Sequence, residues 1–211
     1  MGATVRSAAQ LGATASKAPR TARGERTMRK ILDAARDEFG ERGFSDSSIV
    51  GITQRAGVAL GTFYTYFESK EGLFKALVGD MSAQVRDNVG PALSKGVDGL
   101  DSERRALEAF LRFAHEHRDI YRIIDESEFV EPAAYREHYE TTATRIAARL
   151  RAARDKGELD NALGDDDLNI AAWGMMGANV FLGLRFAVWD DADSARVAEV
   201  MSRVWRQGFS E

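Results

Sequence analysis

The chain has no cysteine and only three prolines among its 211 residues. The absence of cysteine excludes disulfide bonds, thiolate metal sites and cysteine nucleophiles. The scarcity of proline leaves room for long helices. Residues 1–30 also lack the continuous apolar stretch of a secretory signal peptide, because basic residues interrupt them. These absences, with 44% hydrophobic and 29% charged residues, favour a soluble globular protein of one or two domains.

Long uncharged stretches are also rare. The longest that needs a membrane test covers residues 168–184, which is shorter than the ~20 residues of a spanning helix. It contains two asparagines and three glycines, and three aspartates precede it directly. We interpret it as a buried or interfacial helix, expect no membrane partner, and expect a cytoplasmic, nucleoid-associated protein.

The charge is distributed unevenly along the chain. Residues 1–75 carry 12 basic and 8 acidic side chains, a net charge of +4, although the whole chain has a net charge of −4. The remaining 136 residues therefore carry −8. A basic N-terminal third on an acidic body predicts a polyanionic partner at one end of the molecule.

Apolar residues recur with helical spacing along most of the chain, and no stretch alternates as a strand does. The sequence therefore predicts an all-α fold of about nine helices. Residues 1–24 have no apolar period and are expected to form a disordered basic arm, either a tail without function or a contact to nucleic acid. Asp101 and Ser102 predict the start of a helix near 102–117. Later helices are expected near 119–127, 132–157, 166–189 and 193–209.

The segment from Ser47 to Tyr66 has the pattern of a helix–turn–helix unit. Residues 45–48 are good N-cap residues, and a short helix follows them. Gly57 breaks that helix, because glycine readily takes a left-handed turn conformation. A second short helix then begins near Leu60. Such a unit places its second helix in the DNA major groove, although plain helical hairpins show the same pattern.

Five segments in this region resemble the DNA-binding domain of the tetracycline-repressor (TetR) family. They are RKILDAA at 29–35, EFGERGF at 38–44, RAGV at 55–58, GTFYTYF at 61–67 and SKEGL at 69–73. The resemblance implies a DNA-binding domain at 25–75 and an effector-binding and dimerisation domain at 76–211. It also implies a ligand-responsive regulator, most simply a repressor, that binds a palindromic operator as a dimer.

The resemblance also assigns roles to single residues. The recognition helix and its neighbours would contact DNA, with hydroxyl groups and one lysine at phosphates or base edges. Leu60 departs from the usual polar residue of the family and could instead contact a thymine methyl group. The expected DNA contacts are Ser47, Ser48, Leu60, Thr62, Tyr64, Thr65 and Lys70.

The resemblance further implies a ligand site among the middle helices. A small-molecule site needs apolar walls and a few polar groups. Segment 125–132 resembles family members that sense fatty acids or acyl-CoA thioesters, so a small hydrophobic effector is expected. We expect no further cofactor and no metal, because His115 and His117 lie on different faces of one helix. The candidate ligand residues are Phe113, His117, Tyr121, Phe129, Tyr135, Tyr139, Trp173 and Asn179.

Dimerisation is expected through the helices near 166–189 and 193–209, which in the family form a four-helix interface. Gly174 and Gly177 would permit close approach of two helices. Two other readings stay open. A helical-bundle enzyme has acid and base candidates but no nucleophile or phosphate motif, so we expect no enzyme. A dimeric adaptor that does not bind an operator is the alternative that Leu60 suggests.

Overall fold

A computed structural model describes residues 19, 21–160 and 162–209. Within these residues the chain forms nine α-helices and one π-helical segment, η2, and no strand. This confirms the predicted all-α fold. The elements are α1 (Ala22–Asp46), α2 (Ile49–Ala56), α3 (Leu60–Tyr66), α4 (Lys70–Leu93), α5 (Gly99–Glu116), α6 (Asp119–Val130), α7 (Pro132–Asp155), α8 (Asp165–Gly183), η2 (Leu184–Trp189) and α9 (Ser194–Phe209).

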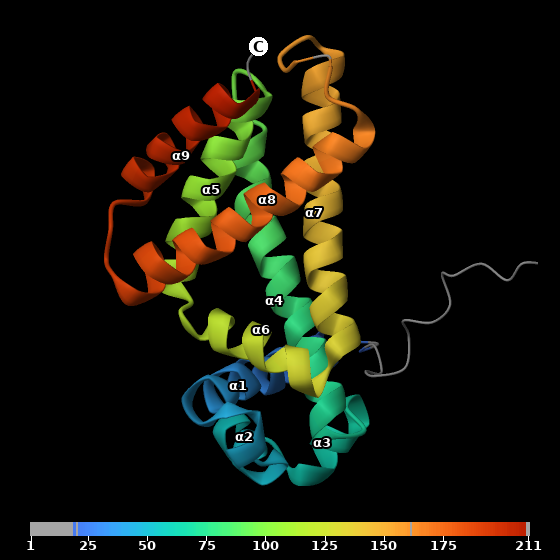
Figure 1. The fold of residues 1–211 in the computed structure, drawn as a ribbon. Helices are drawn as coiled ribbons and strands as arrows, with labels where there is room; N and C mark the ends of the chain where they lie inside the picture. The colour runs from blue at the N-terminus through green and yellow to red at the C-terminus, as the bar shows by residue number, and fades with distance from the viewer. Residues whose placement is uncertain (1–18, 20, 161, 210–211) are drawn as a thin grey trace, which may run out of the picture.

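The first three helices form a separate unit around the start of α4 (Figure 1). Aromatic side chains fill its centre: Phe39, Phe63, Phe67 and Phe74 are fully buried. The rings of Phe39 and Phe74 meet edge to face, with centroids 5.1 Å apart. Because these rings come from α1, α3 and α4 and from the residue after α3, they hold the short helices in place through the core.

Local signals in the sequence explain where the short helices begin and end. The hydroxyl of Ser48 accepts a hydrogen bond from Gly51 N at 3.0 Å and caps α2. Gly57 ends that helix with φ 66° and ψ 36°, the left-handed conformation. Ser69 caps α4 in the same way, through Gly72 N at 3.0 Å. The predicted helix–turn–helix pattern is therefore present as α2, the turn at Gly57, and α3.

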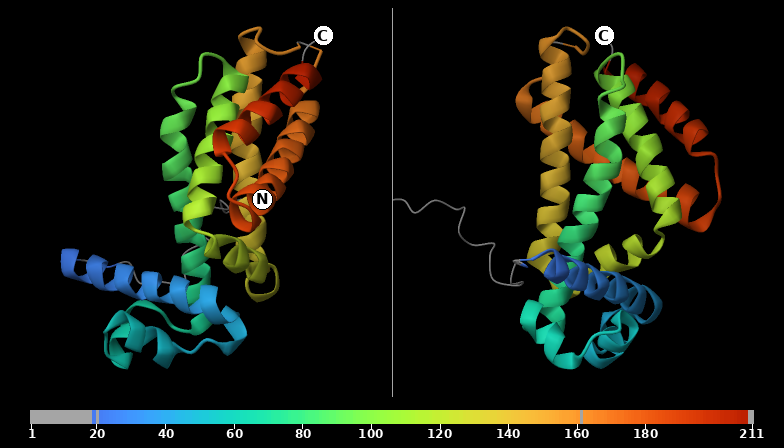
Figure 2. Two further views of the ribbon diagram at one scale, coloured as in Figure 1. Left: turned by 90° about the vertical axis from the view of Figure 1, so that its left-hand side faces the viewer. Right: turned by 180° about the vertical axis from the view of Figure 1, so that it is seen from behind.

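The remaining helices form the body of the molecule. α4 runs from the α1–α3 unit into the body, where it lies beside α5 and α7 (Figures 1 and 2). A second core of leucine, isoleucine, methionine and alanine side chains joins α5, α7, α8 and α9. Because α4 is continuous from Lys70 to Leu93, the boundary predicted between residues 75 and 76 lies inside a helix.

Two predicted boundaries change. α1 already begins at Ala22, capped by the Thr21 hydroxyl, which accepts from Gly24 N at 3.1 Å. Part of the predicted arm 1–24 is therefore helical, and residues 1–18 and 20 lie outside the described residues. α5 begins at Gly99 and not near residue 102, because Asp98 is its cap and accepts from Asp101 N at 2.7 Å.

α8 and η2 together form one helical stretch, Asp165–Trp189. This stretch is long and apolar enough to cross a membrane by length and composition, and 28% of its apolar window is buried inside the molecule. The carboxylate of Asp167 accepts from Gly164 N at 2.8 Å and caps its start, where the helix dipole favours a negative charge. The side of α8 away from the second core is therefore an apolar surface that none of the described residues covers.

Candidate nucleic-acid interface and ligand cavity

Helix α3 presents one face to the core and the other to solvent. Phe63 anchors it and is completely buried, whereas Leu60 and Tyr64 are 46% and 50% exposed. Thr65 is also exposed, and Thr62 is half-buried. Four of the predicted DNA contacts thus lie on one short helix at the end of the molecule far from α8 and α9 (Figure 1).

A network of charged side chains fixes α2 against α1. The guanidinium of Arg55 donates to both carboxylate oxygens of Glu41, at 2.8 and 2.6 Å. It also lies 3.2 Å from the buried carboxylate of Glu38. The bonds to Arg55 lower the pKa of Glu41, and the bonds to Glu41 raise the pKa of Arg55. The network sets the position of α2 and therefore that of the turn leading to α3.

Two other predicted DNA contacts are engaged inside the protein. Ser47 is 5% exposed, and its hydroxyl lies 2.6 Å from Gly43 O and 3.1 Å from Glu38 O. The ammonium of Lys70 donates to Phe44 O at 2.7 Å and to Ser47 O at 2.9 Å. It also lies 4.3 Å from the centre of the Phe44 ring. Both side chains hold the end of α1, whereas Ser48 remains exposed.

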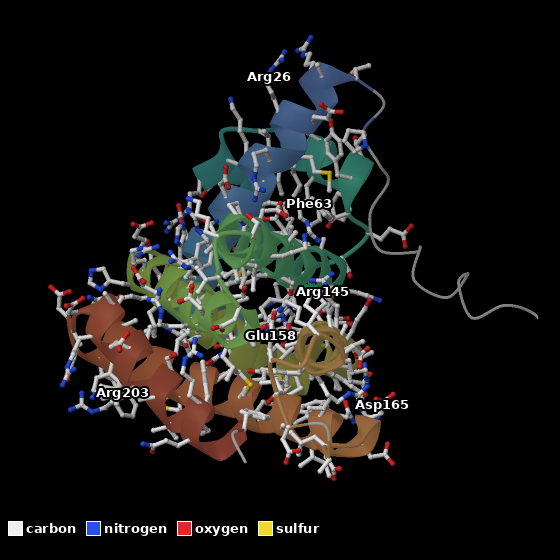
Figure 3. The ribbon with its side chains drawn as sticks, turned by 90° about the horizontal axis from the view of Figure 1, so that it is seen from above. Arg26, Phe63, Arg145, Glu158, Asp165 and Arg203 are labelled. Carbon is white, nitrogen blue, oxygen red and sulfur yellow. The ribbon has the colours of Figure 1, made fainter. Side chains whose placement is uncertain are left out.

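Basic side chains that sequence analysis did not single out as DNA contacts line the start of α1. Arg23, Arg26 and Lys30 are exposed and form no ion pair with any described residue. Arg26 and the α8–α9 pair lie at opposite edges of the molecule (Figure 3). These three cations of α1 add positive charge next to the exposed face of α3, which favours contact with a phosphate backbone.

A cavity of about 190 Å³ lies between α4, α5, α6, α7 and α8. Its walls are mainly apolar, and polar or charged side chains reach it from each of these five helices. Such a lining is typical of a small-molecule site. The apolar wall includes Val85, Val89, Phe110, Ile124, Ile146 and Met176.

Three of the eight predicted ligand residues line this cavity: Tyr121, Tyr139 and Asn179. The other five lie elsewhere. Phe113 is buried, and its ring stacks on the His117 ring with centroids 4.2 Å apart. The ring of Tyr135 packs edge to face on that of Tyr139. Phe129 and Trp173 are 84% and 43% exposed. These five do not line this cavity, because spacing alone does not tell which side of a helix faces the centre, and as ligand contacts they stay a prediction.

Sequence analysis missed other cavity residues on α7. His138, Thr142, Arg145 and Arg149 all line the cavity. They follow one another at intervals of three and four residues and therefore share one face of the helix. That spacing was visible in the sequence. Nothing in the sequence distinguishes this polar face from a solvated one.

Tyr121 joins α6 to α8 across the cavity. Its hydroxyl donates to Val180 O at 3.0 Å. A side chain on Gly183 would collide with that hydroxyl, so glycine at this position permits the close approach of the two helices. Burial raises the pKa of Tyr121 above its usual range. Tyr121 is therefore a neutral hydrogen-bond donor that is held in place by backbone.

His138 is a half-buried base at the cavity wall. Its Nδ1 lies 2.6 Å from the Ser82 hydroxyl. Burial lowers the pKa of His138 from 6.5 to about 4. The neutral ring is therefore the form that the folded protein holds at pH 7.

This burial predicts a pH dependence of stability. Since the pKa of His138 is lower in the folded chain than in the unfolded one, its contribution is complete above pH 6.5 and is lost as the pH falls toward 4. The full loss is about 3 kcal/mol. Urea unfolding at pH 7 and at pH 4.5 should show a larger fall in the wild type than in His138→Leu. Equal falls would contradict the burial of a neutral ring.

Helix α6 contacts the cavity with one face and the α1–α3 unit with another. Tyr121 and Asp125 line the cavity. Arg122 donates to Gly40 O at 3.0 Å and to Glu41 O at 3.1 Å. Glu126 accepts from Phe44 N at 2.7 Å. A displacement of α6 from within the cavity would therefore act directly on the end of α1.

The outer surface of α8 and α9 is apolar. On α8, Ile170 and Phe181 are each 72% exposed, and Trp173 is 43% exposed. On α9, Val204 is 53% exposed. Gly174 and Gly177, which have open space around them, lie on the same helix as the first three. On α8 these residues recur at intervals of three and four positions and therefore share one face of the helix, and exposed apolar residues gathered in this way are typical of interaction sites.

Comparison with known proteins agrees with this geometry. A family profile described as "Bacterial regulatory proteins, tetR family" matches residues 31–77. The HTH-type transcriptional regulator UidR of Escherichia coli is 26% identical over 182 residues, 83% of this chain and 86% of that protein. An uncharacterised HTH-type regulator of Bacillus subtilis, YdgC, is 33% identical over 105 residues. That match covers 48% of this chain and about half, 54%, of YdgC.

The fold also resembles a solved structure with a bound ligand. The transcriptional regulator FadR of Bacillus subtilis in complex with stearoyl-CoA has a TM-score of 0.74 to this chain. The match covers 86% of this chain and 98% of FadR at 17% sequence identity. At that identity the likeness concerns the fold, which is the same arrangement of a helix–turn–helix unit on a helical body.

Proposed function

The chain belongs to the TetR family of bacterial regulatory proteins, and we propose that it is a dimeric transcription regulator whose DNA binding is weakened by a small-molecule effector. We assign DNA binding to residues 25–75 and effector binding and dimerisation to 76–211. The observation that carries this proposal is the double contact of α6, which lines the cavity and also binds the end of α1.

DNA binding rests on the exposed face of α3 and the cations of α1. Leu60, Thr62, Tyr64 and Thr65 would meet the major groove, and Ser48 a phosphate at the start of α2. Arg23, Arg26 and Lys30 would contact the flanking backbone. Ser47 and Lys70, whose polar groups bond to the end of α1, would act by positioning α2 and α4.

The homodimer would form through α8 and α9. Pairing two copies of the exposed surface around Phe181 would bury the apolar side of Asp165–Trp189 in protein instead of in a membrane. A two-fold dimer presents its recognition helices about 34–36 Å apart, one turn of DNA, and so requires a near-palindromic site. We place such a protein in the cytoplasm, with the nucleoid.

The effector would bind in the cavity of about 190 Å³. An engineered cavity of about 150 Å³ in another protein holds one benzene molecule, so this one holds a small hydrophobic molecule as it stands. A fatty acid or acyl-CoA, which the resemblance of segment 125–132 suggests, would have to widen the cavity or extend out of it. The stearoyl-CoA complex of FadR supports that option by fold alone.

Release from DNA would follow from a shift between two states. A ligand changes the equilibrium only by its different affinity for each state. A molecule bound against Tyr121 and Asp125 on α6 would favour the state in which α6 is positioned to contact that molecule. Arg122 and Glu126 on the same helix would then move the end of α1, and with it the spacing of the two α3 helices.

The contact between Glu126 and α1 gives a prediction for stability. Glu126→Ala leaves the half-buried Phe44 N–H without its acceptor, which costs about 1–3 kcal/mol. We expect the melting temperature to fall by several degrees in a calorimetric scan, at ~2–4 °C per kcal/mol for a chain of this size. Glu128→Ala is the matched control, because Glu128 is exposed on the same helix. Equal melting temperatures for the two variants would contradict the assigned role of Glu126.

The test of the function is capture of genomic DNA fragments by the purified full-length protein, followed by footprinting of the most enriched fragment. The expected result is a protected near-palindrome with half-sites about 10 base pairs apart, near a gene whose product handles a small molecule. A protein that binds no fragment better than random duplex at moderate salt would refute the proposal.

A further inference from the structure

Most polar groups around the cavity already have partners within the protein. The Ser82 hydroxyl donates to Val78 O at 2.8 Å, and the Thr142 hydroxyl donates to His138 O at 2.9 Å. Glu103 and Arg149 form an ion pair. Tyr121 donates to Val180 O. Four cavity groups have no such partner among the described residues. Two are exposed, the Asp125 carboxylate and the Arg145 guanidinium, and two are half-buried, the Nε2 atom of His138 and the side-chain amide of Asn179.

The contact between Ser82 and His138 allows the tautomer of the ring to be assigned from the surrounding hydrogen bonds. A hydroxyl has one hydrogen, and that of Ser82 is used at Val78 O. We therefore assign the proton to Nδ1, which then donates to the Ser82 oxygen 2.6 Å away. In a neutral ring with this tautomer, Nε2 carries no proton and can only accept a hydrogen bond. Nε2 has no partner among the described residues, although His138 lines the cavity.

The amide of Asn179 is also unsatisfied. It faces the cavity from α8, the wall opposite α4, and makes no hydrogen bond to any described residue. Its Oδ1 is buried and without a partner. A buried polar group that lacks a hydrogen-bond partner costs folding free energy. Such groups in native proteins commonly bind a water molecule or a ligand. An amide both donates and accepts, whereas Nε2 of His138 only accepts.

The size of the cavity limits what can satisfy these groups. A volume of about 190 Å³ holds about as many non-hydrogen atoms as a benzene ring with one or two substituents. Apolar walls such as Phe110 and Met176 surround that space. A compact apolar molecule fits it, whereas a long saturated chain would have to widen the cavity or extend out of it.

We propose that the cavity is selective for a compact, mainly apolar molecule with one hydroxyl or N–H donor, of which a phenol is the simplest example, and that this donor bonds to Nε2 of His138. Asn179 accepts or donates the second bond of the same polar group. This inference rests on the proposed function only in using the effector cavity, and it names the chemistry that the cavity selects. A hydrocarbon or an ether of the same shape leaves the acceptor unpaired.

The test compares p-cresol with 4-methylanisole, its methyl ether. The two have the same ring, but only p-cresol can donate a hydrogen bond. Titration calorimetry with the full-length protein at pH 7, at millimolar ligand, should show binding of p-cresol that is at least about 10-fold tighter than binding of 4-methylanisole. The long-chain comparison is stearate, which we expect to bind more weakly than p-cresol.

Variants separate the hydrogen bond from packing. His138→Leu removes the acceptor and should abolish the preference for p-cresol. Ser82→Ala removes the group that fixes the tautomer and should reduce the preference, which keeps the test open if His138→Leu fails to fold. His115→Leu is the matched control, because His115 lies outside the cavity, and it should keep the wild-type preference.

Equal affinity of the wild type for the two ligands would overturn the inference, and so would an unchanged preference in folded His138→Leu. Tighter binding of stearate than of p-cresol would overturn it as well. The function is read separately, from release of a captured operator fragment. Selective binding of p-cresol without release supports the inference and refutes the cavity's regulatory role. Failure to bind any DNA leaves the calorimetric result valid and refutes only the proposed function.

Discussion

Phe181→Asp is expected to make the protein monomeric and to weaken its binding to a palindromic operator by about 100-fold or more. Phe181 is 72% exposed on the apolar surface of α8. In the variant, pairing two such surfaces would bury the aspartates of both subunits, and their like charges would repel each other. A protein interface does not tolerate such a pair of buried charges. A monomer binds one half-site and loses the gain from linking two sites, which is about 10²–10⁴ in affinity.

Sedimentation velocity measures the first effect, and fluorescence anisotropy with a labelled operator measures the second. Phe129→Asp is the control, because Phe129 is even more exposed, at 84%, but lies at the end of α6 and outside the α8–α9 surface. That variant should remain dimeric. A Phe181→Asp protein that sediments as a dimer would show that assembly uses another surface.

The second large effect is expected for Leu60→Glu, which should reduce operator affinity about 100-fold while leaving the fold intact. Leu60 is the first residue of α3 and is 46% exposed. A carboxylate there repels phosphates, and a dimer carries two of them. The same carboxylate stabilises the helix, because it lies at the positive end of the helix dipole. A loss of DNA binding therefore does not result from unfolding.

Anisotropy titrations at two salt concentrations, with a thermal melt in parallel, check this prediction. Val97→Glu makes the same change at a residue that is 86% exposed in the α4–α5 connection, far from α3. It should bind the operator as the wild type does. Equal operator affinities for Leu60→Glu and Val97→Glu would place the DNA contacts outside α3.

Features that depend on neighbouring residues were predictable from the sequence. Residue 48 and Gly57 start and end α2 where expected, because caps and left-handed turns involve residues only a few positions apart. The helices of the body were predictable as well, because the helical spacing of apolar residues is also a local pattern. The start of α5 was the exception, since Asp98 and Asp101 compete as caps and Asp101 instead bonds to Arg104 and Arg105.

Features that depend on distant residues were not predictable. Glu126 bonds to Phe44 N, 82 positions away, and Lys70 bonds to the carbonyl of the same residue. Nothing local to either side chain indicates these partners. Lys70 was therefore predicted as a phosphate contact, although its ammonium already has two acceptors in the protein. Whether Trp173 faces the cavity or the surface was not predictable for the same reason, because it depends on how α8 packs against α7.

The position of the tryptophans has an optical consequence. All three tryptophans, Trp173, Trp189 and Trp205, lie in or after α8, and the α1–α3 unit contains none. Trp173 and Trp189 are 43% and 67% exposed, and Trp205 is buried. Tryptophan fluorescence of the native protein therefore comes only from the end of the molecule that we assign to dimerisation. Dilution that separates two subunits should shift this emission to longer wavelength, whereas binding of DNA at α3 should change it only through motion transmitted along the molecule.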